Sequence, residues 1–268
     1  MTSTHRFLNV DIAEGIATVT MNRPPVNALN PPMMREIGEV FTALGADTSA
    51  SVAILDSRRS DVFCAGADIS ESERRHVRRQ ITDDETVADL LDPGAVVRRC
   101  FEAVRAGGLP VIAAVSGAAI GAGVALISCT DLVVAGEDAY VSLPEINVGV
   151  AGGYRHLQRL VGRSKARQMA LTGCRVSAAE MYRLGAVVEV VPTAQVAAAA
   201  RSLAVEMAAK SPLGLRVMRE SIIRSEDMPL DDGYRLEQDY TARASLLADS
   251  QEARAAWREK REPIWAWR

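Results

Sequence analysis

The sequence predicts an α/β fold followed by an all-helical C-terminal region. Short apolar runs rich in β-branched residues alternate with amphipathic helical patterns as far as Val191, and this alternation is typical of α/β folds. From Thr193 onward the strand patterns stop and only helical patterns remain. We therefore expect a core domain over residues 1–195 and a C-terminal helical region over residues 196–268. The apolar faces of these helices suit contact between subunits or a lid over the site. An equal alternative is that they pack against the core of the same chain.

The chain begins with a predicted β-hairpin. Phe7–Asp11 and Ile16–Met21 have strand-like composition, and the Glu14-Gly15 pair between them is typical of a turn. Asn30 is followed by two prolines, which predicts an N-cap and the first turn of a helix. Val52–Leu55 predicts a short buried strand. The hairpin, helix and strand form the first unit of the predicted alternation.

The same order returns later in the chain. Val111–Val115, Leu132–Val134 and Val187–Val191 are predicted strands, and Gly121–Cys129 is a predicted helix between the first two. The C-terminal region divides into helices that begin near Ala194, Pro212, Leu230 and Ser250. Residues 71–94 are strongly charged and predict an exposed helix and a mobile connection. The arginines there are either a solvated face or a lid that pairs with phosphates.

Composition narrows the classes of function. The chain has 268 residues, of which 48% are hydrophobic, so it can bury one large core. A net charge of −3 excludes a strongly basic nucleic-acid-binding surface. The N-terminus lacks an apolar leader, and no run reaches the roughly 18 apolar residues of a membrane span. We expect a cytoplasmic protein with no nucleic-acid or membrane partner.

The sequence predicts neither a metal nor a redox cofactor. The four cysteines are widely separated and lack metal-binding spacing, which favours buried free thiols in a reducing compartment. None of the three histidines is spaced with a second metal ligand. Motifs for nucleotide hydrolysis, dinucleotide binding, zinc proteolysis and serine hydrolysis are missing.

Two small-residue segments and one carboxylate carry the candidate chemistry. Ala65-Gly66-Ala67 and Gly121-Ala122-Gly123 can bring backbone N–H groups close to a ligand oxygen, because they lack bulky side chains. Each alone more often marks tight packing. Glu145, in a third segment, adds one acid/base. Together they suggest a thioester site in which two N–H groups stabilise an oxyanion.

At this point the chain resembles a known family. The motifs that carry the resemblance are Met21–Asn30, Phe63–Asp68, Pro110–Gly117, Gly121–Asp131, Leu143–Gly149 and Leu171–Gly173. Their order and spacing resemble those of the crotonase superfamily, and the whole chain is similar to its enoyl-CoA hydratase/isomerase branch. The resemblance implies a spiral core of ββα repeats and a C-terminal helical region that forms homotrimers, often paired as hexamers.

The resemblance also implies a set of site residues. The oxyanion hole would be formed by the backbone N–H groups of Ala67 and Ala122, the latter replacing a usual glycine. Coenzyme A, as part of the thioester substrate, would bind along Ala28, Ala65, Ala67, Asp68 and Ile69. No permanently bound cofactor is implied.

Hydratases of this family resemble one another in using two glutamates, but this chain matches only the second. Ala125 stands at the first position and Glu145 at the second. One carboxylate allows hydration, isomerisation, C–C hydrolysis or decarboxylation of a thioester through a shared enolate. The leading expectation is an enoyl-CoA hydratase type of lyase. The alternatives are a hydrolase or lyase for a cyclic or branched β-keto or β-hydroxy acyl-CoA, and an acyl-CoA-binding protein without turnover.

Further residues are candidates for the acyl pocket. Leu143 precedes Glu145, and Tyr154, Arg155 and His156 stand where related hydratases have a different sequence. Tyr240 resembles a C-terminal tyrosine of the hydroxycinnamoyl-CoA hydratase-lyases. The alternatives are first-turn helix residues facing solvent or a subunit boundary, and core or interface packing for Tyr240.

Overall fold

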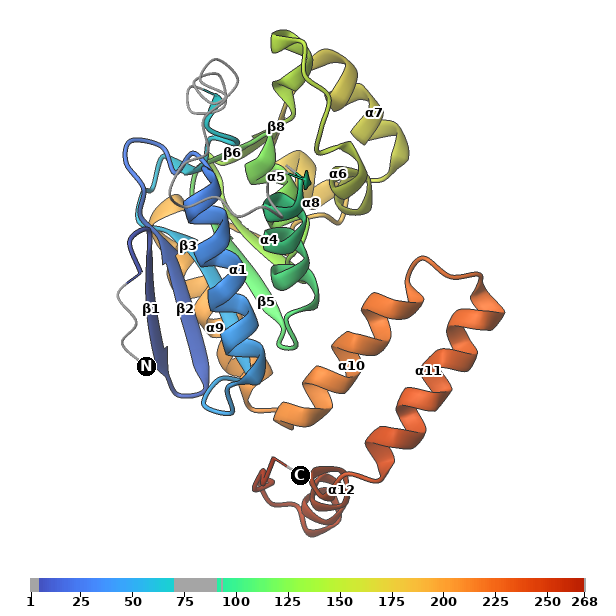
Figure 1. The fold of residues 1–268 in the computed structure, drawn as a ribbon. Coiled ribbons are helices and arrows are strands. Elements are labelled where there is room, and N and C mark those ends of the chain that lie inside the picture. The colour runs from blue at the N-terminus through green and yellow to red at the C-terminus, as the bar shows by residue number, and fades with distance from the viewer. Residues whose placement is uncertain (1–4, 70–90, 93, 268) are drawn as a thin grey trace.

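A six-stranded sheet forms the centre of the body (Figure 1). The computed structural model describes residues 5–69, 91–92 and 94–267. The strands of this sheet are β1 (Leu8–Ala13), β2 (Ile16–Met21), β3 (Val52–Ser57), β5 (Val111–Val115), β7 (Leu132–Gly136) and β10 (Glu189–Val191), in the order β1-β2-β3-β5-β7-β10. The β1–β2 hairpin is antiparallel and the remaining pairings are parallel. The sheet therefore confirms the predicted α/β class.

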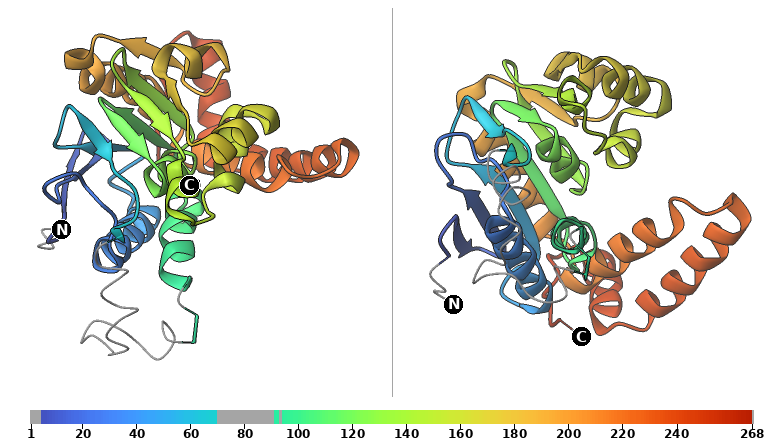
Figure 2. Two further views of the ribbon diagram at one scale, coloured as in Figure 1. Left: turned by 90° about the horizontal axis from the view of Figure 1, so that it is seen from above. Right: turned by 45° about the horizontal axis from the view of Figure 1, so that its top comes forward.

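Helices cover both faces of this sheet. α1 (Pro31–Ala46) and α4 (Ala95–Ala106) lie on one face, and α9 (Val196–Ala208) lies on the other (Figures 1 and 2). The Asn30 side chain accepts a hydrogen bond from the Met33 N–H at 3.1 Å, as the predicted N-cap requires. Strands covered on both faces read as apolar runs, which explains why β3 and β5 were recognisable in the sequence.

A second, smaller sheet lies beside the first. It contains β4 (Val62–Cys64), β6 (Ala118–Ile120), β8 (Tyr140–Ser142) and β9 (Arg175–Ser177), in the order β4-β6-β8-β9. Three residues are too few to show an alternating pattern, so the sequence did not predict these strands. Around this sheet lie α5 (Ala122–Ile127), η1 (Pro144–Val148), α6 (Tyr154–Val161), α7 (Arg163–Thr172) and α8 (Ala178–Arg183).

The predicted helical region divides into two parts. After η2 (Thr193–Gln195), α9 buries Val196, Ala200 and Ala204 against the six-stranded sheet. α10 (Pro212–Ser225), α11 (Leu230–Ser245) and α12 (Ala248–Glu259) form an arm that projects from the body (Figure 1). The packing thus joins α9 to the core, and the arm begins at Pro212. The charged segment predicted over residues 71–94 lies almost wholly outside the described residues.

Two arginines of α10 hold the arm to the body. Arg219 is buried, donates to both carboxylate oxygens of Asp131 at 2.7 and 2.9 Å, and donates to the Val104 carbonyl at 2.9 Å. Asp131 also accepts from the Val111 N–H at 2.7 Å, so one carboxylate joins the starts of β5 and β7 to α10. Arg216 donates to the Gly45 carbonyl in the last turn of α1 at 2.6 Å, and to the Asp47 carbonyl just after this helix at 3.0 Å.

The cysteines form no disulfide among the described residues. Cys64, Cys100 and Cys129 are buried free thiols, and Cys174 is only partly buried. No helix in the described part of the chain is long and apolar enough to cross a membrane.

Replacing Arg219 should destabilise the protein strongly. Arg219→Met keeps most of the side-chain volume but leaves the Asp131 carboxylate and the Val104 carbonyl without their donor. We expect the free energy of unfolding to fall by about 2–3 kcal/mol, measured by urea denaturation. Arg224→Met is the control, because Arg224 forms an exposed ion pair on the same helix and should change stability by less than about 0.5 kcal/mol. Equal effects of the two changes would contradict the anchoring role of Arg219.

Candidate active site

A close contact between two glycine turns builds the centre of the site. Gly66 follows β4 with φ +94°, and Gly121 follows β6 with φ +55° and ψ −120°. A Cβ on Gly66 would lie 2.9 Å from the Ile120 carbonyl oxygen and 3.4 Å from the Ala122 nitrogen. Both the positive φ angles and this spacing require glycine. The turns after β4 and β6 therefore meet backbone to backbone.

This contact places two backbone donors beside each other. Ala67 follows Gly66 and Ala122 follows Gly121, and both residues line one cavity. Within the described residues, neither N–H donates to a protein acceptor. Ala122 carries a methyl group and begins α5, so its backbone is in an allowed helical conformation. The pair can donate to one oxygen atom of a ligand, which is the arrangement of an oxyanion hole.

Glu145 lies against the same turn. Its segment, η1, follows β8, and a Cβ on Gly121 would collide with Glu145 Oε1. Glu145 Oε2 is buried and has no hydrogen-bond partner among the described residues. Burial raises the pKa of this carboxyl group, and only the backbone of Glu145 itself opposes the shift. A carboxyl group with a raised pKa beside these two donors has the chemistry of a general acid and base.

The donors and Glu145 open into a cavity of about 510 Å³. Ala125 lines it at the position where the two-glutamate pattern would place a second carboxylate. The rest of the lining comes from α4, from the loop that follows η1, and from α6. These residues are Val97, Arg98, Phe101, Glu102, Arg105, Val150, Gly152, Gly153 and His156.

The structure brings one of the four predicted acyl-pocket residues into this cavity. His156 lines it, whereas Leu143, Tyr154 and Tyr240 are not among the lining residues. Leu143 is buried directly beneath Gly153, and Tyr154 packs against the core from the start of α6. Tyr240 lies in the arm, where its hydroxyl donates to Glu220 at 2.9 Å. Contacts with neighbouring residues of the same chain account for where these three side chains lie.

The predicted coenzyme A segment forms a continuous strip. The Leu29 N–H donates to Gly66 O at 2.7 Å and the Asp68 N–H donates to Leu29 O at 3.0 Å, so residues 65–69 run beside residues 26–29. Arg23 joins the two runs by donating to the Ala28 carbonyl and to Asp68, both at 2.7 Å. Ala28 and Ala65 are half-buried, and Ile69 is exposed.

Asn27 supports this strip and was not predicted to have a role. Its amide donates to Ser57 Oγ at 2.9 Å and to the Phe63 carbonyl at 3.1 Å, and its carbonyl accepts from the Arg23 N–H at 2.7 Å. Asn27 has φ +51°, a conformation that asparagine tolerates better than most residues. The signal available in the sequence was an asparagine two residues after a pair of prolines and directly before Ala28.

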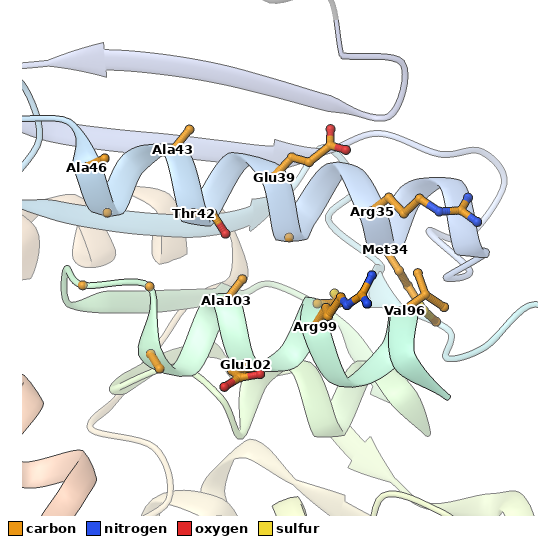
Figure 3. Close-up of a pocket in the computed structure, with 16 residues that line it drawn as sticks. Met34, Arg35, Glu39, Thr42, Ala43, Ala46, Val96, Arg99, Glu102 and Ala103 are labelled. Atoms are coloured by element: carbon orange, nitrogen blue, oxygen red, sulfur yellow. The ribbon is translucent and has the colours of Figure 1, made fainter. Parts of the chain in front are cut away.

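A larger groove lies elsewhere, between α1 and α4. It has a volume of about 1030 Å³, and Figure 3 shows Thr42 and Ala103 pointing toward each other across it. Neither Glu145 nor the two donors line this groove. Glu102 points away from α1 and also lines the cavity of Glu145 (Figure 3). The chemistry therefore concentrates in the smaller cavity, and α4 separates the two.

Sequence reasoning missed the contribution of α4. Val97, Phe101 and Arg105 line the cavity from successive turns of this helix. Their spacing of four residues would have identified them as one helical face. No group of three or more His, Cys, Asp or Glu side chains in the described residues is arranged to bind a metal.

The two packed sheets, the paired glycine turns and the projecting helical arm define a crotonase-type fold. A profile of the enoyl-CoA hydratase/isomerase family matches residues 11–268. The chain therefore belongs to the enoyl-CoA hydratase/isomerase family.

Relatives within this family have more than one activity. A (7aS)-7a-methyl-1,5-dioxo-2,3,5,6,7,7a-hexahydro-1H-indene-carboxyl-CoA hydrolase of Mycobacterium tuberculosis is 34% identical over 246 residues, which cover 92% of this chain and 96% of the relative. A 2,3-dehydroadipyl-CoA hydratase of Escherichia coli is 32% identical, covering 96% of this chain and 97% of the relative. Among solved structures, an enoyl-CoA hydratase/isomerase from Mycobacterium paratuberculosis superposes with a TM-score of 0.89 at 28% identity, covering 99% of this chain and 100% of that one.

Burial of Glu145 should reduce stability at neutral pH. Because its pKa in the folded protein is raised above the ordinary value of 4.5, ionisation is unfavourable in the fold. The penalty is absent below the unfolded pKa and grows as the pH rises through the folded pKa. Glu145→Gln should therefore be more stable than the parent at pH 8, and this difference should vanish below about pH 4.5.

Urea denaturation across this pH range measures the effect. Glu237→Gln, at an exposed position of α11, makes the same chemical change without burial and is the control. If the stability difference between Glu145→Gln and the parent matched that of the control at every pH, the raised pKa of Glu145 would be refuted.

Proposed function

We propose that this protein is an acyl-CoA enzyme of the enoyl-CoA hydratase type that uses Glu145 as its single carboxylate acid/base. The observation that carries the proposal is the cavity that Glu145 shares with the unpaired N–H groups of Ala67 and Ala122. Coenzyme A would lie along the strip formed by residues 65–69 and Ala28, and no other cofactor is needed. Family membership supports an acyl-CoA substrate.

The proposed hydration needs one carboxylate used twice. Glu145 removes a proton from a water molecule as the water oxygen forms a bond to C3 of the enoyl thioester. The electron pair of the double bond moves through C2 to the thioester oxygen, where the Ala67 and Ala122 N–H groups stabilise the enolate. Protonated Glu145 then returns its proton to C2. The raised pKa of Glu145 suits both steps, because the group must accept and release a proton at similar pH.

The second candidate is hydrolysis of a cyclic β-keto acyl-CoA. It is favoured by Ala125, which leaves Glu145 as the carboxylate that matches the two-glutamate pattern, and by the 34% identity to the indene-carboxyl-CoA hydrolase. Here Glu145 removes a proton from water as its oxygen adds to the ring ketone. The C2–C3 bond then breaks, and its electrons form the same thioester enolate, which takes a proton at C2. Hydration and ring opening both add one water, but only ring opening creates a new carboxylic acid, which tandem mass spectrometry of the product would reveal.

We also propose that the arm formed by α10–α12 is a contact surface between copies of the chain. Its exposed apolar residues include Met218, Ile222, Met228, Leu230, Tyr234, Leu246 and Trp257. So many large exposed apolar side chains on one projecting unit favour self-association over a monomer. The resemblance to the crotonase superfamily implies that the assembly is a homotrimer or a pair of trimers. The buried free thiols suit a reducing compartment such as the cytoplasm.

Removing the acid/base should separate binding from turnover. Glu145→Gln keeps the shape of the side chain but cannot accept a proton, so kcat should fall by at least about 100-fold. Loss of the enoyl thioester absorbance of crotonyl-CoA measures turnover, and calorimetry measures affinity for coenzyme A thioesters, which should change little. A Glu145→Gln protein with full activity would rule out the proposed role.

Disturbing the glycine contact should remove the oxyanion donors. In Gly66→Ala the new methyl group meets the Ile120 carbonyl and the Ala122 nitrogen, so the two N–H groups must move apart. We expect kcat/KM to fall by about 100-fold, the effect of losing one such donor.

Gly185→Ala is the matched control for this change. Gly185 has φ +74°, but nothing lies within 4 Å of its added Cβ, so the variant carries similar backbone strain without the contact. Its kcat/KM should stay near the parent value. A Gly66→Ala enzyme as active as Gly185→Ala would show that the donor pair is not needed.

A further inference from the structure

One wall of the cavity carries hydrogen-bond donors that the proposed chemistry does not use. Arg105 comes from α4 and His156 from α6, and both line the cavity that also contains Glu145. The oxyanion donors and Glu145 suffice for the reacting carbons of a thioester. The cavity therefore has polar groups left over for another part of the acyl group.

Arg105 keeps most of its donors available. Its single recorded partner in the described residues is Glu226, and the distance from Arg105 Nη1 to Glu226 Oε1 is 3.5 Å. Glu226 is held more closely by Arg159, which does not line the cavity. A guanidinium has five N–H groups and no acceptor, so Arg105 can donate into the cavity while it stays near Glu226.

His156 is held in a fixed orientation. Its ring meets Phe101 edge to face, with centroids 5.3 Å apart and an interplanar angle of 79°. Its Nδ1 lies 3.5 Å from Cys129 Sγ. Burial raises the pKa of the Cys129 thiol to about 12, so the thiol keeps its proton. Burial and the nearby arginines Arg159, Arg105 and Arg155 lower the pKa of His156, which keeps the ring neutral.

We propose that Arg105 and His156 form a donor site for an oxygen atom on the acyl group, and that the substrate is an acyl-CoA with a keto or carboxylate oxygen beyond its reacting carbons. The proposed site uses the tautomer of the neutral ring in which Nδ1 accepts from the Cys129 thiol and Nε2–H donates to the ligand. The inference rests on the proposed acyl-CoA function and specifies its substrate class.

Charged groups on this wall and outside the cavity bear on which kind of oxygen is bound. Glu102 lies one turn before Arg105 and would repel a carboxylate close to it, and Arg98 is paired with Asp92. Arg155 pairs with Asp227 at 3.5 Å and Arg159 pairs with Glu226, so these cations are partly neutralised. A ketone oxygen and a carboxylate oxygen both accept hydrogen bonds, so measured affinities for thioesters that carry each group are needed to distinguish them.

Binding of saturated thioesters tests the inference without depending on the reaction. Hexanoyl-CoA, adipoyl-CoA and 5-oxohexanoyl-CoA have equal acyl chain lengths and differ in the distal oxygen, and calorimetry on the intact protein gives each affinity. We expect at least one oxygenated thioester to bind about tenfold or more tightly than hexanoyl-CoA. Tighter adipoyl-CoA would identify a carboxylate, and tighter 5-oxohexanoyl-CoA would identify a ketone.

Variants locate the preference. The quantity compared is the affinity for the preferred oxygenated thioester divided by the affinity for hexanoyl-CoA. Arg105→Gln should reduce this ratio by about tenfold. Arg159→Gln, which removes the other arginine that pairs with Glu226 but lies outside the cavity, should keep the ratio within about twofold. His156→Phe keeps an aromatic ring against Phe101 but removes the donor, so it should also lower the ratio. This variant tests the inference on its own if Arg105→Gln does not fold. Equal affinities for all three thioesters, or a ratio unchanged in both cavity variants, would overturn this inference and leave the proposed function standing. Failure of every thioester to bind would overturn the proposed function as well.

Discussion

The contact between Gly66 and Gly121 is the constraint on which the rest of the site depends. The turns after β4 and β6 approach so closely that an added Cβ on Gly66 would meet the Ile120 carbonyl, and one on Gly121 would meet the Glu145 carboxylate. Three separate parts of the chain therefore share one small volume. Because β4, β6 and β8 are neighbours in one sheet, their ends bring the two alanine donors and Glu145 together. The short sheet thus acts as the frame of the site.

This frame leaves Glu145 in an unfavourable environment. Glu145 Oε2 is buried without a hydrogen-bond partner in the described part of the chain, although most buried carboxylate oxygens have one. A side chain selected for stability alone would have a partner or would be apolar. The unsatisfied oxygen and the raised pKa fit the proposed role of Glu145 in proton transfer, which would account for this local loss of stability. The anchored core and the Arg219–Asp131 pair supply stability elsewhere.

Much of the fold could be predicted because its main strands are long and covered on both faces. β2, β3, β5 and the helix that begins after Asn30 each carry a local signal that packing preserves. The second sheet could not be predicted, since its strands have three residues and gain their definition from neighbours distant in sequence. For the candidate site, Glu145 and the alanine donors were predicted from sequence motifs. Arg105 was missed because only the packing of α4 shows which of its faces meets the cavity.

Glu145 and the wall that carries Arg105 and His156 would act on different parts of the substrate. With Ala125 in place of a second acid/base, no side chain at that position orients a water molecule or moves a second proton. Orientation of the substrate must then come from groups that hold its acyl end, so that the reacting carbons stay within reach of Glu145. Phe101 and Val97 provide apolar contact, and the donors of Arg105 and His156 lie on the same wall. In the proposed reaction Glu145 serves both the addition and the protonation step, so tight positioning of the acyl group beside this carboxylate matters most.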